Sequence, residues 1–151
     1  MKKSIILILL LLCCQATFSQ AGKPSYDEKL AKSLNAEDNG MKTYVFCLLK
    51  TGSATATKEE GTKLFNGHMA NITRLAKEGK LIVAGPFMKN DKNYRGLFIL
   101  NVSTIEEAQA LVQTDPAVKA NLLEADLTVW YGSAALQETV KIHDKITKPK
   151  S

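Results

Sequence analysis

The stretch from residue 63 to residue 87 constrains the fold of this chain more than any other. Its first part carries apolar side chains at the spacing of an α-helix, on a face formed by Leu64, Phe65, Ile72, Leu75 and Ala76. His68 falls on the same face, four residues after Leu64 and four before Ile72. The pattern therefore predicts an amphipathic helix that directs a titratable ring toward whatever the helix packs against.

The same stretch then predicts a buried strand. Gly79 stands where a helix commonly ends with a left-handed glycine. Residues 81–87 form a short apolar run that ends around Gly85-Pro86, as is typical of a strand buried in a core. We therefore expect a helix over residues 58–78, followed directly by this strand.

The chain opens with the pattern of a secretory signal peptide. A basic start is followed by an apolar run at residues 5–14 and then by small or polar residues. A run of this length is too short to span a bilayer as a helix. We predict a signal peptide over residues 1–19, cleaved ahead of Gln20, and an exported protein, periplasmic or extracellular, with no integral membrane segment after cleavage.

Charge and cysteine content argue against several classes of function. The formal charge is +5, but the lysines are scattered among acids, so the chain lacks the basic stripe of a nucleic-acid-binding protein.

The cysteines indicate neither a lipid anchor nor a disulfide. Cys13 and Cys14 lie in the predicted signal peptide, and neither follows the small residue that lipoprotein processing prefers. Cys47 then has no intramolecular partner and is predicted to be a core residue. With two histidines and no cysteine pair, we expect neither a metal nor a cofactor.

The expected elements follow a β-α-β-β-α-β order. Strands are predicted at residues 43–50, 81–87, 95–102 and 127–131, with a polar hairpin loop at residues 89–94. Ser103 and Glu106 match a capping box that starts the second helix. This order predicts an α+β, ferredoxin-like βαββαβ fold, in which two helices cover one face of a four-stranded antiparallel sheet.

The domain is expected to span residues 43–135. Residues 20–42 are predicted to form a linker with a short N-terminal helix, and residues 136–151 a C-terminal helix, over residues 136–146, and a tail. The first strand is apolar on both sides, so one side packs on the helices and the other needs a cover. We expect that cover to be a second copy of the chain, in a homodimer. The alternative is that the two terminal helices cover it.

Six short motifs keep one order along the chain. They are Gly67-His68 with Leu75 and Gly79-Lys80-Leu81, Ala84-Gly85-Pro86, Arg95-Gly96, Glu106-Glu107-Ala108, Asp115-Pro116-Ala117-Val118, and Trp130-Tyr131. Together they resemble the YCII-related family of the dimeric α/β-barrel superfamily, over residues 41–135. The resemblance implies a ferredoxin-like subunit that dimerises through its sheet faces, which agrees with the order of elements above.

The resemblance also implies a His/Asp active site, at His68 and Asp115. One relative is similar to a dehydrochlorinase acting on a chlorinated hydroxyquinol, and the wider superfamily includes lactone isomerases and monooxygenases that work without metal. This chain departs from the family at Asn121, where a glycine is common after the Asp-Pro motif. Asparagine tolerates the left-handed backbone that such a turn requires.

Each candidate residue also has a simpler structural explanation. A single histidine on an apolar helix face is often a core residue, and an Asp before a Pro is the expected N-cap of a short helix. If His68 and Asp115 meet, however, the carboxylate fixes the imidazole tautomer and prepares the ring for general acid–base catalysis, worth about 10²–10⁴-fold in rate. Arg95 and Trp130 are the candidates for substrate binding, although solvation and packing also explain them.

The sequence therefore predicts an exported small-molecule enzyme that uses His68 and Asp115 in elimination, isomerisation or related proton-transfer chemistry. The absence of a recognisable nucleophile motif argues against acyl-enzyme chemistry. Two alternatives stay open. The same dimer binds a small ligand without turnover, or it scaffolds a partner protein through its terminal extensions.

Overall fold

A computed structural model describes residues 25–149 of the chain. The predicted signal peptide over residues 1–19 lies outside the described residues, as do residues 20–24 of the predicted linker and residues 150 and 151. Among the described residues, no helix is both long enough and apolar enough to cross a bilayer.

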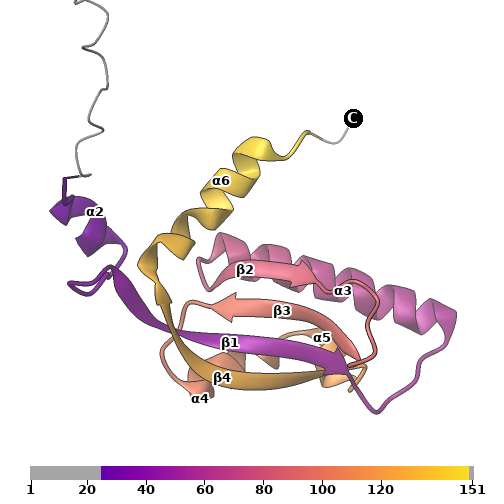
Figure 1. Cartoon of the computed structure of the whole chain (residues 1–151). Helices are drawn as coiled ribbons and strands as arrows, with labels where there is room; N and C mark the ends of the chain where they lie inside the picture. The colour runs from indigo at the N-terminus through magenta and orange to yellow at the C-terminus, as the bar shows by residue number, and fades with distance from the viewer. Residues whose placement is uncertain (1–24, 150–151) are drawn as a thin grey trace, which may run out of the picture.

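Four antiparallel strands form one sheet in the order β2-β3-β1-β4 (Figure 1). The strands are β1 (Met41–Thr51), β2 (Leu81–Pro86), β3 (Tyr94–Leu100) and β4 (Leu123–Ser133). One side of the sheet carries the helices α3 (Lys58–Lys77), α4 (Ile105–Val112) and α5 (Pro116–Lys119). This is the ferredoxin-like βαββαβ arrangement, and it confirms the predicted fold class.

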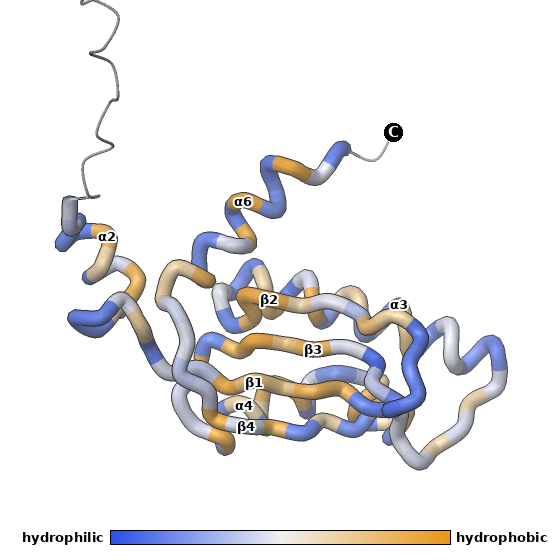
Figure 2. The backbone as a smooth tube through the Cα atoms, in the orientation of Figure 1, coloured by the Kyte–Doolittle hydropathy of each residue, from blue (hydrophilic) through white to orange (hydrophobic). Residues whose placement is uncertain are grey.

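The hydrophobic core lies between the sheet and these helices. Along β1, Val45, Cys47 and Leu49 point inward and are buried. They pack with Phe98 of β3 and Leu75 of α3 in one continuous cluster. Figure 2 shows the apolar residues concentrated along the two central strands, β1 and β3. Burial of each aliphatic side chain of this size stabilises the fold by about 1.5–3 kcal/mol.

The other face of the sheet carries the alternate apolar residues. Phe46 and Leu48 of β1 pair with Ile99 and Leu97 of β3, and all four are half-buried. No helix of residues 25–149 crosses the middle of this face (Figure 1). The C-terminal helices therefore cover only one end of this face, where Tyr44 is fully buried, and leave its middle open.

Short helices flank the domain at both ends. α2 (Glu28–Ser33), capped by Asp27, falls within the predicted linker. At the other end, a 3-10 helix, η1 (Ala134–Glu138), contacts β1 and β2 and precedes α6 (Thr139–Ile146). The helix predicted over residues 136–146 is therefore two segments of different geometry.

The last strand, β4, is longer than predicted and begins four residues before the expected start at residue 127. Leu123, Ala125 and Leu127 pack against the core, while Glu124 and Asp126 between them are exposed. This alternation is that of a half-buried strand, and pairing with the full length of β1 holds it in place.

The capping box of α4 lies one residue later than predicted. Thr104 is the N-cap and Glu107 the third helical residue, in place of Ser103 and Glu106. Both pairs match the same motif, so local sequence does not separate them. In the observed helix Ala108 is buried on the inner face of α4.

Cys47 is fully buried in the core, as predicted. Burial, and then the charges of Asp126 and Asp115, raise the pKa of the Cys47 thiol to about 12. The pKa of Cys47 in the folded chain thus lies above its ordinary value of 9.0, so the buried thiol favours the folded state below pH 9.0. This contribution to stability is lost as the pH rises toward 12.

We therefore expect Cys47 to resist thiol reagents in the folded protein. At pH 8 its alkylation should be slower than in denaturant by on the order of a thousandfold, because both the thiolate fraction and access are small. Peptide mapping by mass spectrometry separates Cys47 from Cys13 and Cys14. Labelling of Cys47 at the same rate with and without denaturant would contradict its place in the core.

Candidate active site

The helix α3 directs His68 onto the inner face of the sheet, as its apolar stripe predicted. A complete capping box of Thr57 and Glu60 starts the helix, and Gly79, with a φ of 67°, follows its C-cap. The His68 ring stacks on Phe98 of β3, with ring centroids 6.0 Å apart and planes 22° apart. Its side chain is 13% exposed, so the imidazole is largely but not fully enclosed.

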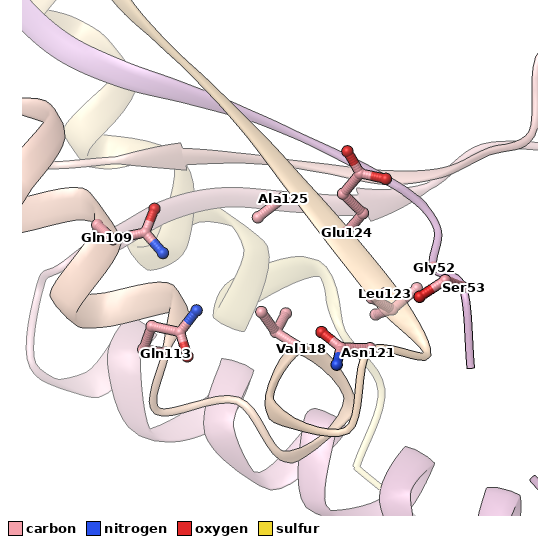
Figure 3. A pocket seen from close by; sticks show the side chains of 9 residues that line it. All are labelled: Gly52, Ser53, Gln109, Gln113, Val118, Asn121, Leu123, Glu124 and Ala125. Carbon is pink, nitrogen blue, oxygen red and sulfur yellow. The ribbon is translucent and has the colours of Figure 1, made fainter. Parts of the chain in front are cut away.

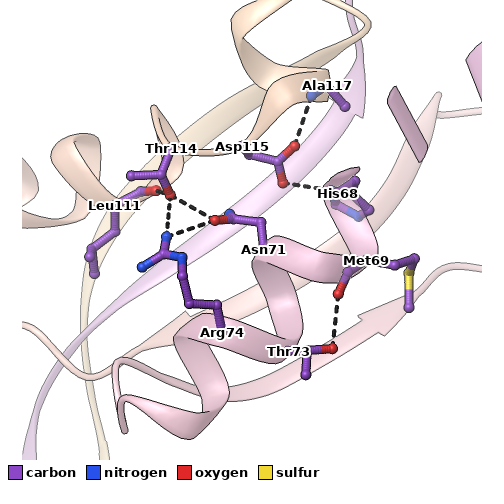
Figure 4. A network of polar contacts seen from close by, with 9 residues as sticks. All are labelled: His68, Met69, Asn71, Thr73, Arg74, Leu111, Thr114, Asp115 and Ala117. Carbon is purple, nitrogen blue, oxygen red and sulfur yellow. Dashed lines mark hydrogen bonds and ion pairs between the residues drawn. The ribbon is translucent and has the colours of Figure 1, made fainter. Parts of the chain in front are cut away.

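Asp115 performs two tasks at once (Figure 4). As the N-cap of α5 it accepts, through Oδ1, a hydrogen bond of 2.9 Å from the backbone N–H of Ala117. Its other oxygen, Oδ2, lies 2.6 Å from His68 Nδ1. The side chain is fully buried. The helix cap that explains Asp115 structurally and the contact with His68 are therefore not alternatives, because each uses a different oxygen.

The partners of Asp115 set the state of the imidazole. An ionised carboxylate only accepts hydrogen bonds, so when Asp115 is ionised His68 Nδ1 carries a proton and donates a hydrogen bond to it. The neutral ring then has its lone pair on Nε2. Within residues 25–149, His68 Nε2 makes no hydrogen bond. The arrangement can accept a proton at Nε2 while Asp115 stabilises the imidazolium that results.

A close approach of α3 to the Pro116 ring of α5 brings these side chains together. Gly67 on α3 packs against Pro116, and a Cβ at position 67 would lie 2.9 Å from Pro116 Cγ. Real Cβ atoms essentially never come this close, so any larger residue would push α3 away from α5. The glycine before His68 and the proline after Asp115 are thus parts of the same contact.

Two further candidates, Arg95 and Trp130, are not brought to this pair. Trp130 pairs with Tyr44 on the open face of the sheet and stacks on its ring, with centroids 6.0 Å apart. Arg95 is exposed near the start of β3, where its Nε donates to Thr51 Oγ1 over 2.7 Å. Their role in substrate binding stays a prediction, and in one copy of the chain neither lies beside His68.

A polar network that the sequence analysis did not single out adjoins the pair (Figure 4). Arg74 Nη2 donates to Asn71 Oδ1 over 2.7 Å and to Thr114 Oγ1 over 2.8 Å. Asn71 is 7% exposed and lies one helical turn after His68. Asn71 is a polar residue on an otherwise apolar helix stripe, and this was the local pattern that could have indicated the network.

Two cavities of the described chain lie away from His68. One of about 280 Å³ opens between α4, α5 and the start of β4, where Gln109 and Gln113 face Ser53 and Asn121 (Figure 3). A second, of about 360 Å³, lies beside the first turns of α3 at Glu60 and Leu64. Neither is lined by His68 or Asp115.

Residues 25–149 contain no cluster of three or more histidines, cysteines or acids able to hold a metal ion.

The sequence matches the YCII-related domain over residues 41–130, which include the whole contact between His68 and Asp115. The chain belongs to the YCII-related domain family. This confirms the resemblance inferred from the six motifs. No curated protein matches the chain.

One solved structure similar to this YCII-related protein is an enzyme. It is 5-chloro-2-hydroxyhydroquinone dehydrochlorinase from Burkholderia phenoliruptrix AC1100, solved in complex with 2,5-dihydroxybenzoquinone. The two sequences are 22% identical, and the match covers 57% of this chain and 92% of the other, with a TM-score of 0.41.

Proposed function

We propose that this YCII-related protein is a small-molecule enzyme in which His68 transfers a proton through Nε2 and Asp115 orients its ring. One observation carries the proposal: Asp115 Oδ2 lies 2.6 Å from His68 Nδ1 while Oδ1 is held by the Ala117 N–H. Because both carboxylate oxygens have defined partners, an ionised Asp115 holds the ring in one orientation and favours the tautomer with its proton on Nδ1.

The chemistry that suits this arrangement is proton abstraction. His68 Nε2 takes a proton from an acidic C–H or O–H of the substrate, and the imidazolium is stabilised by Asp115. In an isomerisation the same ring returns the proton to another atom of the substrate. In an elimination the substrate's electron pair expels a leaving group as an anion, and the proton passes to water. The apolar rings of Phe98 and Phe65 near His68 favour a partly apolar substrate.

Turnover assays in deuterated water test the proposal. A panel of lactones and hydroxylated aromatics supplies acidic protons, and we expect either formation of product, as in an elimination, or entry of deuterium at carbon, as in an isomerisation. His68→Ala should abolish both. His143→Ala is the matched control, because His143 lies on the exposed surface of α6 and is the other histidine of the chain. Product formation or deuterium entry that survives His68→Ala would contradict the proposal, and ligand binding with neither would favour the non-catalytic alternative.

We also propose that the open face of the sheet packs against a second copy. The support is the set of half-buried apolar residues there: Phe46, Leu48, Leu97 and Ile99. Light scattering at micromolar concentration should give a dimer mass, and Leu97→Lys should shift it to the monomer. Met88→Lys, in an exposed loop, is the control. A monomer mass for the unaltered protein would exclude this dimer.

We propose, finally, that the protein is exported by the signal peptide predicted over residues 1–19. N-terminal sequencing of the protein from its producing cell should begin at Gln20. A retained Met1 would contradict this assignment.

A further inference from the structure

The segment that carries Asp115 is short of regular structure. It lies between the end of α4 at Val112 and the start of α5 at Pro116, and α5 itself has only four residues. Within the segment, the Asp115 N–H donates to the Val112 carbonyl over 3.1 Å. A catalytic geometry built on so short a loop needs contacts from outside it.

Three consecutive residues of this segment meet α3 in matched order. Pro116 lies against Gly67, Asp115 contacts His68, and Thr114 contacts Asn71. We infer that Asn71 and Thr114, tied together by Arg74, are positioning residues that hold Asp115 in hydrogen-bonding distance of His68. The close Gly67–Pro116 contact fixes one side of the pair, and the Asn71–Thr114 contact fixes the other (Figure 4).

The geometry of the network suits this task. Thr114 Oγ1 lies 2.9 Å from Asn71 Oδ1 and 2.7 Å from the Leu111 carbonyl, and these two acceptors share its single proton. Arg74 donates to both Asn71 and Thr114, and its other nitrogen donates to the Glu78 carboxylate. Hydrogen bonds from a charged donor are stronger than neutral ones, so Arg74 draws the asparagine and the threonine to one point.

Asn71 makes this contact at a cost in stability. Its amide nitrogen, Nδ2, is buried and has no hydrogen-bond partner within the described residues. Rotating the amide would place that nitrogen against the donors of Arg74 and Thr114, so the orientation is fixed. A buried unpaired donor is unfavourable, and an apolar residue of the same shape avoids it. The contact with Thr114 therefore explains why residue 71 is an asparagine, whereas a contribution to stability does not explain it.

The inference rests on the proposed function for its effect on turnover, but its test needs no substrate. In ¹⁵N-labelled protein carrying His143→Gln, the one remaining imidazole is that of His68. We expect its Nδ1 proton to appear as a slowly exchanging resonance. Thr114→Val should speed the exchange of this proton by about tenfold, and Thr114→Ser, which restores the hydroxyl, should return it to within about twofold.

Thr73→Val is the matched control. Thr73 also lies beside Arg74, but its hydroxyl donates only to the Met69 carbonyl of its own helix, so the Nδ1 resonance should not change. Asn71→Leu, which keeps a similar volume, should act like Thr114→Val and replaces it if that variant fails to fold. Unchanged exchange in folded Thr114→Val or Asn71→Leu overturns the inference, whatever the turnover. Faster exchange together with absent turnover in unaltered protein leaves the positioning role standing and removes the proposed function.

Discussion

Asp115→Asn is expected to lower turnover by about 10²–10⁴-fold while leaving the protein folded. The asparagine oxygen can still accept from the Ala117 N–H, because Asn and Asp are equally good N-caps. Its amide nitrogen then takes the place of Oδ2 and donates to His68 Nδ1. The imidazole proton moves to Nε2, and the lone pair that would accept the substrate proton is lost.

Asp115→Ala separates this effect from stability. It removes the N-cap, at about 1 kcal/mol, and leaves His68 Nδ1 without its partner in a largely buried site, at about 1–3 kcal/mol more. Urea unfolding should therefore separate the two variants, with Asp115→Ala less stable by about 2–4 kcal/mol, whereas kcat/KM should fall in both. Asp27→Asn, at the exposed N-cap of α2, is the matched control and should change neither quantity. Turnover of Asp115→Asn within a few-fold of the unaltered protein would contradict the role of Asp115.

The fold was predictable because its signals are local. The helix that carries His68 has a regular apolar stripe and is followed by a glycine. The dipeptide Asp115-Pro116 is the usual N-cap and first residue of a helix, so it predicts the start of α5. Where local signals were duplicated or weak, prediction failed. Two overlapping capping motifs precede α4, and charged residues interrupt the start of β4, so in neither place does the local pattern give the observed boundary.

The contact between His68 and Asp115 could not be derived from local pattern. The two residues are 47 positions apart, and only the resemblance to the family paired them. The contact depends on how closely α3 approaches α5, which Gly67 permits. The face on which Arg95 and Trp130 lie depends on strand register, and a shift by one residue reverses every side chain of a strand. Such features require the assembled sheet.

Gly52→Ala is expected to lower the free energy of unfolding by about 3 kcal/mol, the upper end of ordinary overpacking. A Cβ at position 52 would lie 2.0 Å from the backbone oxygen of Asn121. That oxygen cannot move away easily, because the Ala54 N–H donates to it over 3.0 Å. Asn121 is also held in a left-handed conformation, with a φ of 55°, so the departure from the family's usual glycine keeps the turn.

The strain caused by Gly52→Ala should displace Asp115 in the candidate active site as well as destabilise the fold. The segment after α5 is tied back to it by the Leu122 N–H, which donates to the Ala117 carbonyl over 3.0 Å. Displacing Asn121 therefore moves Ala117, whose own N–H holds Asp115 Oδ1. We expect turnover to fall together with the urea midpoint.

Gly61→Ala is the matched control. A Cβ added at position 61 on α3 would have nothing within 4 Å, so the same change should stabilise the helix by about 0.5–1 kcal/mol. Equal stability of Gly52→Ala and the unaltered protein would contradict the close approach of Gly52 to the Asn121 backbone.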